Sequence, residues 1–169
     1  MKFTIGFEKE DSVKLHQYWD EIIANQQWSE GKFTKRFEEE WGEYNGAHSV
    51  AFSSWGGAAL AALEFYNLKG KTVLCPSNTF MATPLSVIKV GGQVEFVDCN
   101  TSDLCISFND LKAKIEQYRP AAIWVVHIGG HIAFQIEEIA QLCQEKKIIL
   151  LEDCAHAHGA SWNAKKAGT

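Results

Sequence analysis

Several signatures of common protein classes are absent from this chain of 169 residues. Arginine, the side chain that most often clamps phosphate groups, occurs only at Arg36 and Arg119, and the formal net charge is −5. These features argue against a basic face for nucleic acid or anionic lipid. The apolar runs, such as residues 121–126, are far shorter than the about 20 residues that span a bilayer. We therefore expect neither a nucleic acid nor a membrane as a partner.

The cysteine pattern lacks a CxxC pair, and the number of cysteines is odd. Free thiols in a reducing compartment fit this pattern better than a disulfide framework does. The first residues turn acidic at Glu8 before a long apolar stretch forms, so they do not resemble a signal peptide. We expect a cytoplasmic protein. The cysteines are Cys75, Cys99, Cys105, Cys143 and Cys154.

The motifs GxGxxG, GxSxG and HExxH are also missing, which removes the simplest dinucleotide, hydrolase and zinc-protease interpretations. What the chain does have is 46% hydrophobic and 22% charged residues, the composition of a globular domain with a core. Helical patterns cover residues 11–25 and continue from Phe33, and we assign residues 1–47 to an N-terminal helical segment.

From residue 48 onward, short apolar runs alternate with helical patterns. This alternation predicts an α/β fold, a mostly parallel sheet flanked by helices, over residues 48–169. The expected strands are His48–Ser53, Thr72–Cys75, Gln93–Val97, Ala121–Val126 and Ile148–Glu152, and the expected helices are Gly57–Asn67, Ala82–Val90, Asn109–Tyr118 and Gln135–Lys146. Ligands of such open sheets bind beyond the carboxyl ends of the strands. The polar and glycine-rich segments there are residues 53–57, 76–80, 127–131 and 153–156.

Asp153 is the candidate site residue with the clearest physical argument. The apolar run of residues 148–151 delivers it to the end of a buried strand, where a carboxylate is costly without a cation or several hydrogen bonds. One suitable partner is the protonated ring nitrogen of pyridoxal phosphate. The alternative is that Asp153 caps the following turn.

Two further segments carry weaker signals. Gly56 and Gly57 open a helix after an apolar run, where free amides and the helix dipole favour a phosphate group, although a tight turn would need glycine for its own conformation. Phe80 follows another strand end, where its ring can stack on a flat cofactor or begin the next helix as a core residue.

The histidines offer a separate possibility. If two loops converge, a zinc or iron site can form, although the spacing of residues 154–158 is not a standard ligand spacing. The residues concerned are His127, His131, His156 and His158, with Cys154 and Asp153.

Five ordered segments together resemble the DegT/DnrJ/EryC1/StrS family of pyridoxal-phosphate sugar aminotransferases. The likeness runs from about Trp28 to Thr169, and residues 152–160 (EDCAHAHGA) with the final Gly-Thr are its most specific part. The other segments are residues 31–38 (GKFTKRFE), 53–60 (SSWGGAAL), 76–83 (PSNTFMAT) and 96–98 (FVD). The resemblance implies an aspartate-aminotransferase-like large domain, which is incomplete here, and a homodimer.

The resemblance also implies roles for individual residues. Asp153 would pair with the pyridine nitrogen, Phe80 would stack on the ring, and Gly56 and Gly57 would hold the phosphate. His156 stands where the family commonly has glutamine and would contact the phenolic oxygen. Gly57 replaces the usual threonine and lacks its hydroxyl. The Schiff-base lysine of the family falls beyond Thr169, so the catalytic lysine is not identified in this chain, and we expect the chain by itself to be inactive.

The function implied for the full-length protein is transfer of an amino group, from a donor such as glutamate, to a nucleotide-linked keto sugar, as in polysaccharide biosynthesis. A deoxysugar dehydratase of the same family, which uses histidine in place of the lysine, is the alternative. A non-catalytic remnant or a metal-binding protein are the others.

Overall fold

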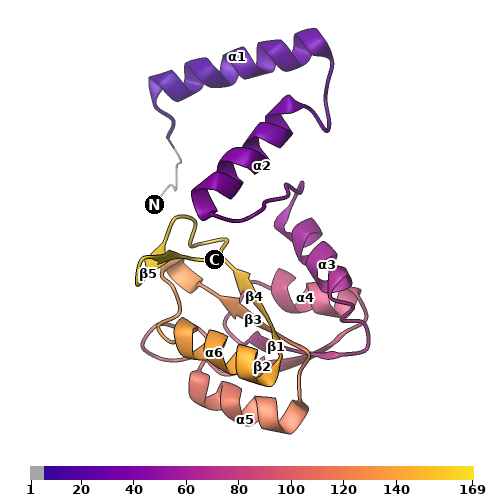
Figure 1. Cartoon of the computed structure of the whole chain (residues 1–169), viewed down its shortest axis with the longest axis vertical. Helices are drawn as coiled ribbons and strands as arrows, with labels where there is room; N and C mark the ends of the chain where they lie inside the picture. Colours follow the sequence, from indigo (N-terminus) through magenta and orange to yellow (C-terminus); the bar gives the residue numbers. More distant parts are fainter. Residues whose placement is uncertain (1–5) are drawn as a thin grey trace. The chain divides into compact units, whose positions relative to one another are not determined.

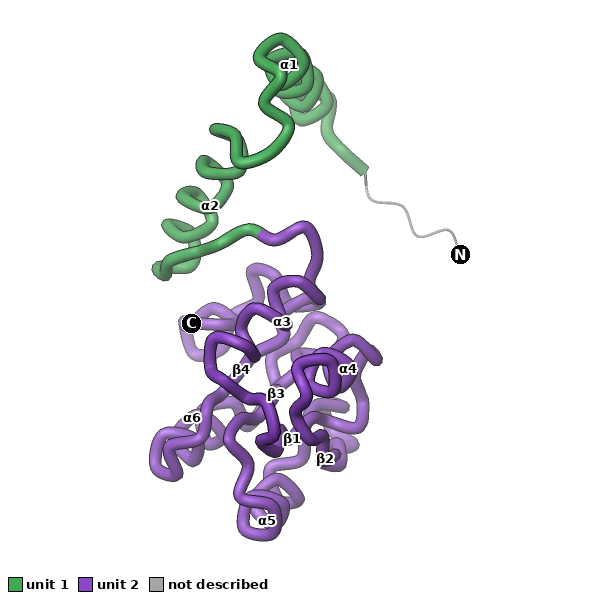
Figure 2. Tube along the Cα trace, turned by 90° about the vertical axis from the view of Figure 1, so that its right-hand side faces the viewer, with its two compact units in different colours: residues 1–51 green, residues 52–169 purple. Residues whose placement is uncertain are grey.

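The computed structural model describes residues 6–169, which form two compact units separated in sequence between Ala51 and Phe52 (Figure 2). The first unit contains α1 (Lys9–Asn25) and α2 (Lys32–Asn45), which confirms both predicted helices. The rings of Tyr18 and Phe33 lie 4.8 Å apart, and Arg36 Nη1 donates a hydrogen bond to the Tyr18 hydroxyl. The sequence-based division after residue 47 remains a proposal, and its first five residues lie outside the described part.

The second unit is built on a parallel sheet with the strand order β2-β1-β3-β4 (Figure 1). The strand order reverses between β1 and β3, and such a reversal opens a crevice at the carboxyl ends of the strands. The elements are α3 (Trp55–Phe65), β1 (Thr72–Pro76), α4 (Ala82–Lys89), β2 (Gln93–Val97), α5 (Phe108–Tyr118), β3 (Ala122–Val126), α6 (Ile136–Lys146) and β4 (Ile149–Asp153). The predicted α/β architecture is confirmed.

Both faces of the sheet are covered, because successive side chains of a strand point to opposite faces. Val73 and Trp124 pack with Leu63 of α3 on one face, and Leu74 and Ile123 pack on the opposite face in a core with residues of α5 and α6. Figure 1 shows α3 and α4 on one side of the sheet and α5 and α6 on the other. Side chains buried on both sides explain why these strands lack polar alternation.

The predicted strand His48–Ser53 is wrong. Within residues 6–169, this segment pairs with no strand and has no regular secondary structure. A strand exists only where its backbone groups find a neighbouring strand, and an apolar pattern alone does not supply one. The segment instead leads into Ser54, the N-cap residue of α3.

The last residues of the chain form a short antiparallel hairpin of β5 (Ser161–Trp162) and β6 (Lys165–Lys166). Its two turn residues, Asn163 and Ala164, have φ values of 47° and 64°, the left-handed conformation that tight hairpin turns require. Over the described residues, every helix is too short or too polar to cross a membrane.

Candidate functional site

A cavity of about 310 Å³ opens beyond the carboxyl ends of β1, β3 and β4, at the predicted edge of the sheet. Each of the four polar segments expected there contributes at least one residue, and four of the five predicted cofactor residues line the cavity. The lining residues are Ser54, Trp55, Gly56, Phe80, Ala82, Thr83, Val126, Ile128, Asp153, Ala155 and His156. Gly57 is the predicted residue that does not line it.

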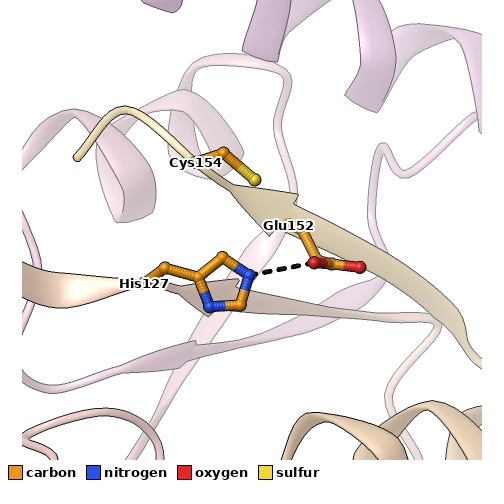
Figure 3. A group of neighbouring side chains, drawn as sticks. All are labelled: His127, Glu152 and Cys154. Carbon is orange, nitrogen blue, oxygen red and sulfur yellow. Dashed lines mark hydrogen bonds and ion pairs between the residues drawn. The ribbon is translucent and has the colours of Figure 1, made fainter. Parts of the chain in front are cut away.

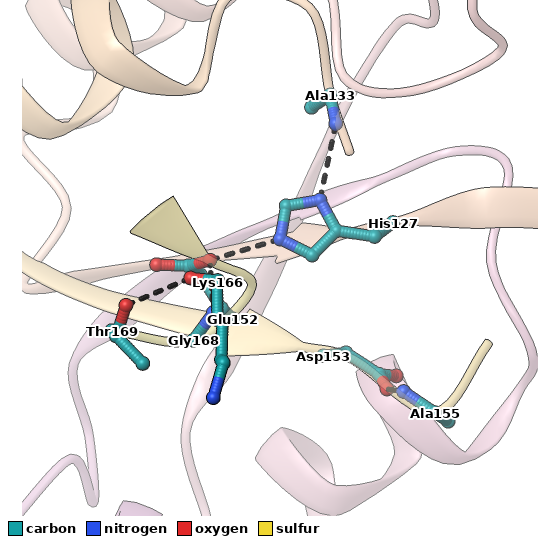
Figure 4. Close-up of polar contacts among 8 residues, drawn as sticks. All are labelled: His127, Ala133, Glu152, Asp153, Ala155, Lys166, Gly168 and Thr169. Carbon is teal, nitrogen blue, oxygen red and sulfur yellow. Dashed lines mark hydrogen bonds and ion pairs between the residues drawn. The ribbon is translucent and has the colours of Figure 1, made fainter. Parts of the chain in front are cut away.

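Asp153 is buried, with a relative exposure of 6%. Its position in β4 places it on the same face as Leu151, the face covered by α3 and α4. Its Oδ1 accepts a hydrogen bond from the Ala155 amide at 3.0 Å, so the predicted turn-capping role is present (Figure 4). Among the described residues, Asp153 forms no ion pair. A buried carboxylate on a cavity wall that has no cationic partner in the protein can stabilise a cationic group of a ligand.

Thr83 is a site residue that sequence reasoning missed. It is fully buried in the first turn of α4, and its hydroxyl donates to Asp153 Oδ2 at 3.5 Å. The hydroxyl groups of Thr83 and Thr79 lie 2.8 Å apart. No local sequence pattern predicts this contact, because Thr83 and Asp153 are 70 residues apart in sequence.

The start of α3 forms another wall of the cavity. Ser54 caps the helix, because its Oγ accepts the Gly57 amide at 3.1 Å, and its carbonyl accepts the Ala58 amide. Within the described residues, the amides of Trp55 and Gly56 have no acceptor. A Cβ on Gly56 would meet nothing closer than 3.9 Å, so the bare glycine leaves open space at the helix start. Free amides at a helix start bind anions such as phosphate.

Phe80 and His156, which are 76 residues apart in sequence, line the same cavity. Phe80 is 78% exposed, so it is a rim residue and not the core phenylalanine of the alternative interpretation. His156 Nδ1 accepts the Gly129 amide at 3.4 Å. This bond places the histidine proton on Nε2, which makes the second nitrogen a donor.

A second group of polar side chains lies on the other face of β4. His127, Glu152 and Cys154 bring a nitrogen, an oxygen and a sulfur within 4.8 Å of one another (Figure 3). His127 Nε2 and Glu152 Oε2 are 2.9 Å apart. Nitrogen, oxygen and sulfur ligands of these residue types are those of a zinc site.

The hydrogen bonds of His127 argue against a metal at this cluster. Its Nδ1 accepts the Ala133 amide at 3.1 Å, so the ring proton is on Nε2, which donates it to Glu152. A metal on Nε2 would leave both ring nitrogens without a proton, whereas metal-bound histidines donate from the second nitrogen. Burial, with the nearby charges of Glu152 and Asp153, raises the pKa of the Cys154 thiol to about 12 and disfavours a thiolate ligand. His131 is occupied elsewhere, at the Asp103 carbonyl.

The family profile described as the DegT/DnrJ/EryC1/StrS aminotransferase family matches residues 9–169. The chain belongs to this family. It is 33% identical over 143 residues to GDP-perosamine synthase of Vibrio cholerae, covering 83% of this chain and 38% of that protein. It is also 33% identical to UDP-4-amino-4,6-dideoxy-N-acetyl-beta-L-altrosamine transaminase of Campylobacter jejuni strain 81-176. That match covers 89% of this chain and 39% of that protein.

Solved structures show the same fold, among them a DegT DnrJ EryC1 StrS aminotransferase from Brucella abortus, which superposes with a TM-score of 0.86 at 25% identity and covers 93% of this chain and 44% of that one. GDP-4-keto-6-deoxy-D-mannose-3-dehydratase from E. coli, solved with bound hydrated pyridoxal phosphate (PLP), superposes with a TM-score of 0.86 at 26% identity. The match covers 98% of this chain and 43% of that one. This chain thus spans less than half the length of the relatives it matches, and it corresponds to part of their PLP-enzyme fold.

Proposed function

We propose that this chain forms the cofactor-binding part of a PLP-dependent aminotransferase that transfers an amino group to a nucleotide-linked keto sugar. The observation that carries the proposal is Asp153, a buried carboxylate facing a cavity and without a cationic partner among the described residues. The family membership and the sugar transaminases among the relatives support it.

The residues around the cavity fit each part of the cofactor. Asp153 would hold the proton on the pyridine nitrogen, because a negative neighbour favours the protonated ring. The free amides of Trp55 and Gly56 would hold the phosphate, and Gly57 would act through the Ser54 cap. When bound, the cofactor supplies an electron sink for carbanion chemistry at the amino-bearing carbon.

Phe80 and His156 complete the fit. The exposed Phe80 ring at the cavity rim would cover one face of the cofactor ring. The Nε2 proton of His156 would be donated to the phenolic oxygen, a hydrogen bond that stabilises negative charge on that oxygen. Both residues would therefore help to orient the cofactor ring so that its nitrogen meets Asp153.

The proposal includes the wider setting of the enzyme. The amino donor is a compound such as glutamate, and the family resemblance favours a homodimer. All five cysteines are free thiols, which supports a reducing compartment such as the cytoplasm. Mass measurement of the purified protein in solution tests the dimer.

The deciding experiment uses the full-length protein. It is incubated with PLP, glutamate and a nucleotide-linked 4-keto sugar, and the products are identified by mass spectrometry. An aminated nucleotide sugar together with 2-oxoglutarate supports the proposal. Absence of PLP binding by the folded protein overturns it.

A dehydratase is the second candidate, because the E. coli dehydratase superposes over nearly the whole chain. The same incubation separates the two functions. A deoxygenated sugar without nitrogen identifies a dehydratase, and an amino sugar identifies an aminotransferase. The resemblance places the Schiff-base lysine of the family beyond Thr169. The codon at that position therefore gives an independent test, because lysine indicates an aminotransferase and histidine a dehydratase.

A further inference from the structure

Glu152 stands beside Asp153 on β4 and points to the opposite face of the sheet (Figure 4). One of its oxygens, Oε2, accepts two hydrogen bonds, from His127 Nε2 at 2.9 Å and from the Gly168 amide at 3.0 Å. Its side chain is 19% exposed and that of His127 is fully buried. A single carboxylate oxygen thus joins two segments that are 41 residues apart in sequence, at positions 127 and 168.

The His127 ring transmits this connection to the loop after β3. The Ala133 amide donates to Nδ1 at 3.1 Å, and Nε2 donates to Glu152. The ring therefore bridges Ala133 and Glu152 in a single tautomer and orientation. The same loop reaches the cofactor cavity, because Ile128 lines it and the Gly129 amide holds His156. The Glu152 carboxylate therefore fixes the backbone from which the cavity wall is built.

Gly168 is specified by its surroundings as the other end of the connection. Its φ is +80°, and a Cβ at this position would lie 3.2 Å from Cys154 Sγ. A glycine is needed here to bring the amide to Glu152 and to adopt the left-handed conformation. The hairpin that precedes Gly168 is thereby attached to the end of β4.

We propose that Glu152 is a positioning residue, which acts through His127 to hold the cavity loop of residues 127–133 and through Gly168 to fix the course of the chain after the hairpin. This inference rests on the proposed function only for its effect on the cofactor. The attachment itself is a property of the chain. We call these contacts the Glu152 clamp, made of His127, Ala133, Glu152 and Gly168.

The clamp predicts a difference between two substitutions. In Glu152→Gln, the amide oxygen can take the place of Oε2 and accept both hydrogen bonds, because both donors share one oxygen. In Glu152→Leu, the His127 Nε2 proton and the Gly168 amide lose their acceptor. Glu137→Leu is the matched control, because Glu137 also holds the hairpin, by accepting Asn163 Nδ2 at 3.1 Å, but does not contact His127.

The first measurement needs no cofactor. Hydrogen exchange of the full-length protein is followed at the amides of Ala133 and Gly168, and the His127 tautomer is read from its ring ¹⁵N shifts. Glu152→Leu is expected to speed exchange at both amides by about tenfold or more, because Gly168 loses its acceptor and the His127 ring that accepts the Ala133 amide loses its anchor. Glu152→Gln and Glu137→Leu are expected to leave both amides protected. Unchanged protection in Glu152→Leu overturns the clamp.

The second measurement is the affinity for PLP. Glu152→Leu is expected to weaken binding by about tenfold, and Glu152→Gln to stay within about twofold of the wild type. Should Glu152→Leu not fold, Glu152→Ser replaces it, since serine is polar but too short to reach Gly168. Lost protection with unchanged PLP affinity overturns the positioning role. A wild-type protein that does not bind PLP refutes the proposed function, and the clamp is then judged by exchange alone.

Discussion

Replacing Asp153 by asparagine is the substitution that tests the candidate site most directly. Asparagine keeps the size of the side chain and an oxygen for the Ala155 amide, which Asp153 Oδ1 accepts at 3.0 Å. It removes the negative charge that we expect to face the pyridine nitrogen. The chain should therefore still fold, and the change should appear in catalysis.

The size of the effect follows from the burial of Asp153, which is 6% exposed. Removing one partner of a buried ion pair costs about 3–5 kcal/mol. Since about 1.4 kcal/mol is a tenfold change in rate, amino transfer by Asp153→Asn should fall by about two to four orders of magnitude. Asp153→Ala should abolish transfer, while the visible absorbance of bound PLP largely remains.

The control is Asp103→Asn, because Asp103 is also a buried aspartate, 2% exposed, but does not line the cavity. Its two oxygens accept the amides of Cys105 and Phe134, so asparagine leaves one amide without an acceptor. We expect a loss of about 1–3 kcal/mol in the free energy of unfolding and little change in turnover. An Asp153→Asn enzyme that retains a tenth or more of wild-type turnover would refute the role assigned to Asp153.

Three further predictions concern the stability of the chain, measured by urea denaturation. Ser54→Ala removes the α3 cap and should lower the free energy of unfolding by about 1 kcal/mol; no loss would mean that the cap is not used. Gly168→Ala forces a Cβ against Cys154 at positive φ and should cost about 1–2 kcal/mol, so an unchanged value contradicts the described close approach. Burial raises the pKa of Cys75 from 9.0 to about 12, so the unfolded chain loses this proton first and stability falls above pH 9. Between pH 8 and pH 10, wild type should lose about 1.4 kcal/mol more than Cys75→Ala, and equal losses would contradict the shift.

Much of the fold could be predicted because local patterns and burial agree. The apolar run before Asp153 is a buried strand, and the helices from Ala82, Phe108 and Ile136 start within one residue of the predicted positions. The segment at residues 48–53 failed because strand formation depends on a neighbour that a local pattern does not reveal. The other predicted strands each pair with a neighbouring strand in the sheet of the second unit.

The candidate site was predictable to the extent that it depends on strand ends. Parallel strands bring their carboxyl ends to one edge, so the grouping of Asp153, His156, Phe80 and Gly56 follows from topology. Thr83 was missed because its contact with Asp153 comes from the packing of α4 on the sheet. Ser54 had a local signal, because a serine three residues before Gly57 can cap a helix by accepting the Gly57 amide.

The two adjacent carboxylates of β4 show how one strand end can serve both a reaction and the structure around it. Asp153 and Glu152 differ by one position, and strand geometry sends them to opposite faces. Asp153 faces a cavity and has no cation in the described chain, whereas both hydrogen bonds of Glu152 Oε2 are made to protein groups. The main-chain amide of His127 donates to the Asp153 carbonyl at 3.1 Å, so the backbone that carries the first carboxylate is held by the residue that binds the second. A substitution of Glu152 therefore reaches the cofactor only indirectly, through His127 and the backbone that His127 holds, whereas one of Asp153 acts on it directly.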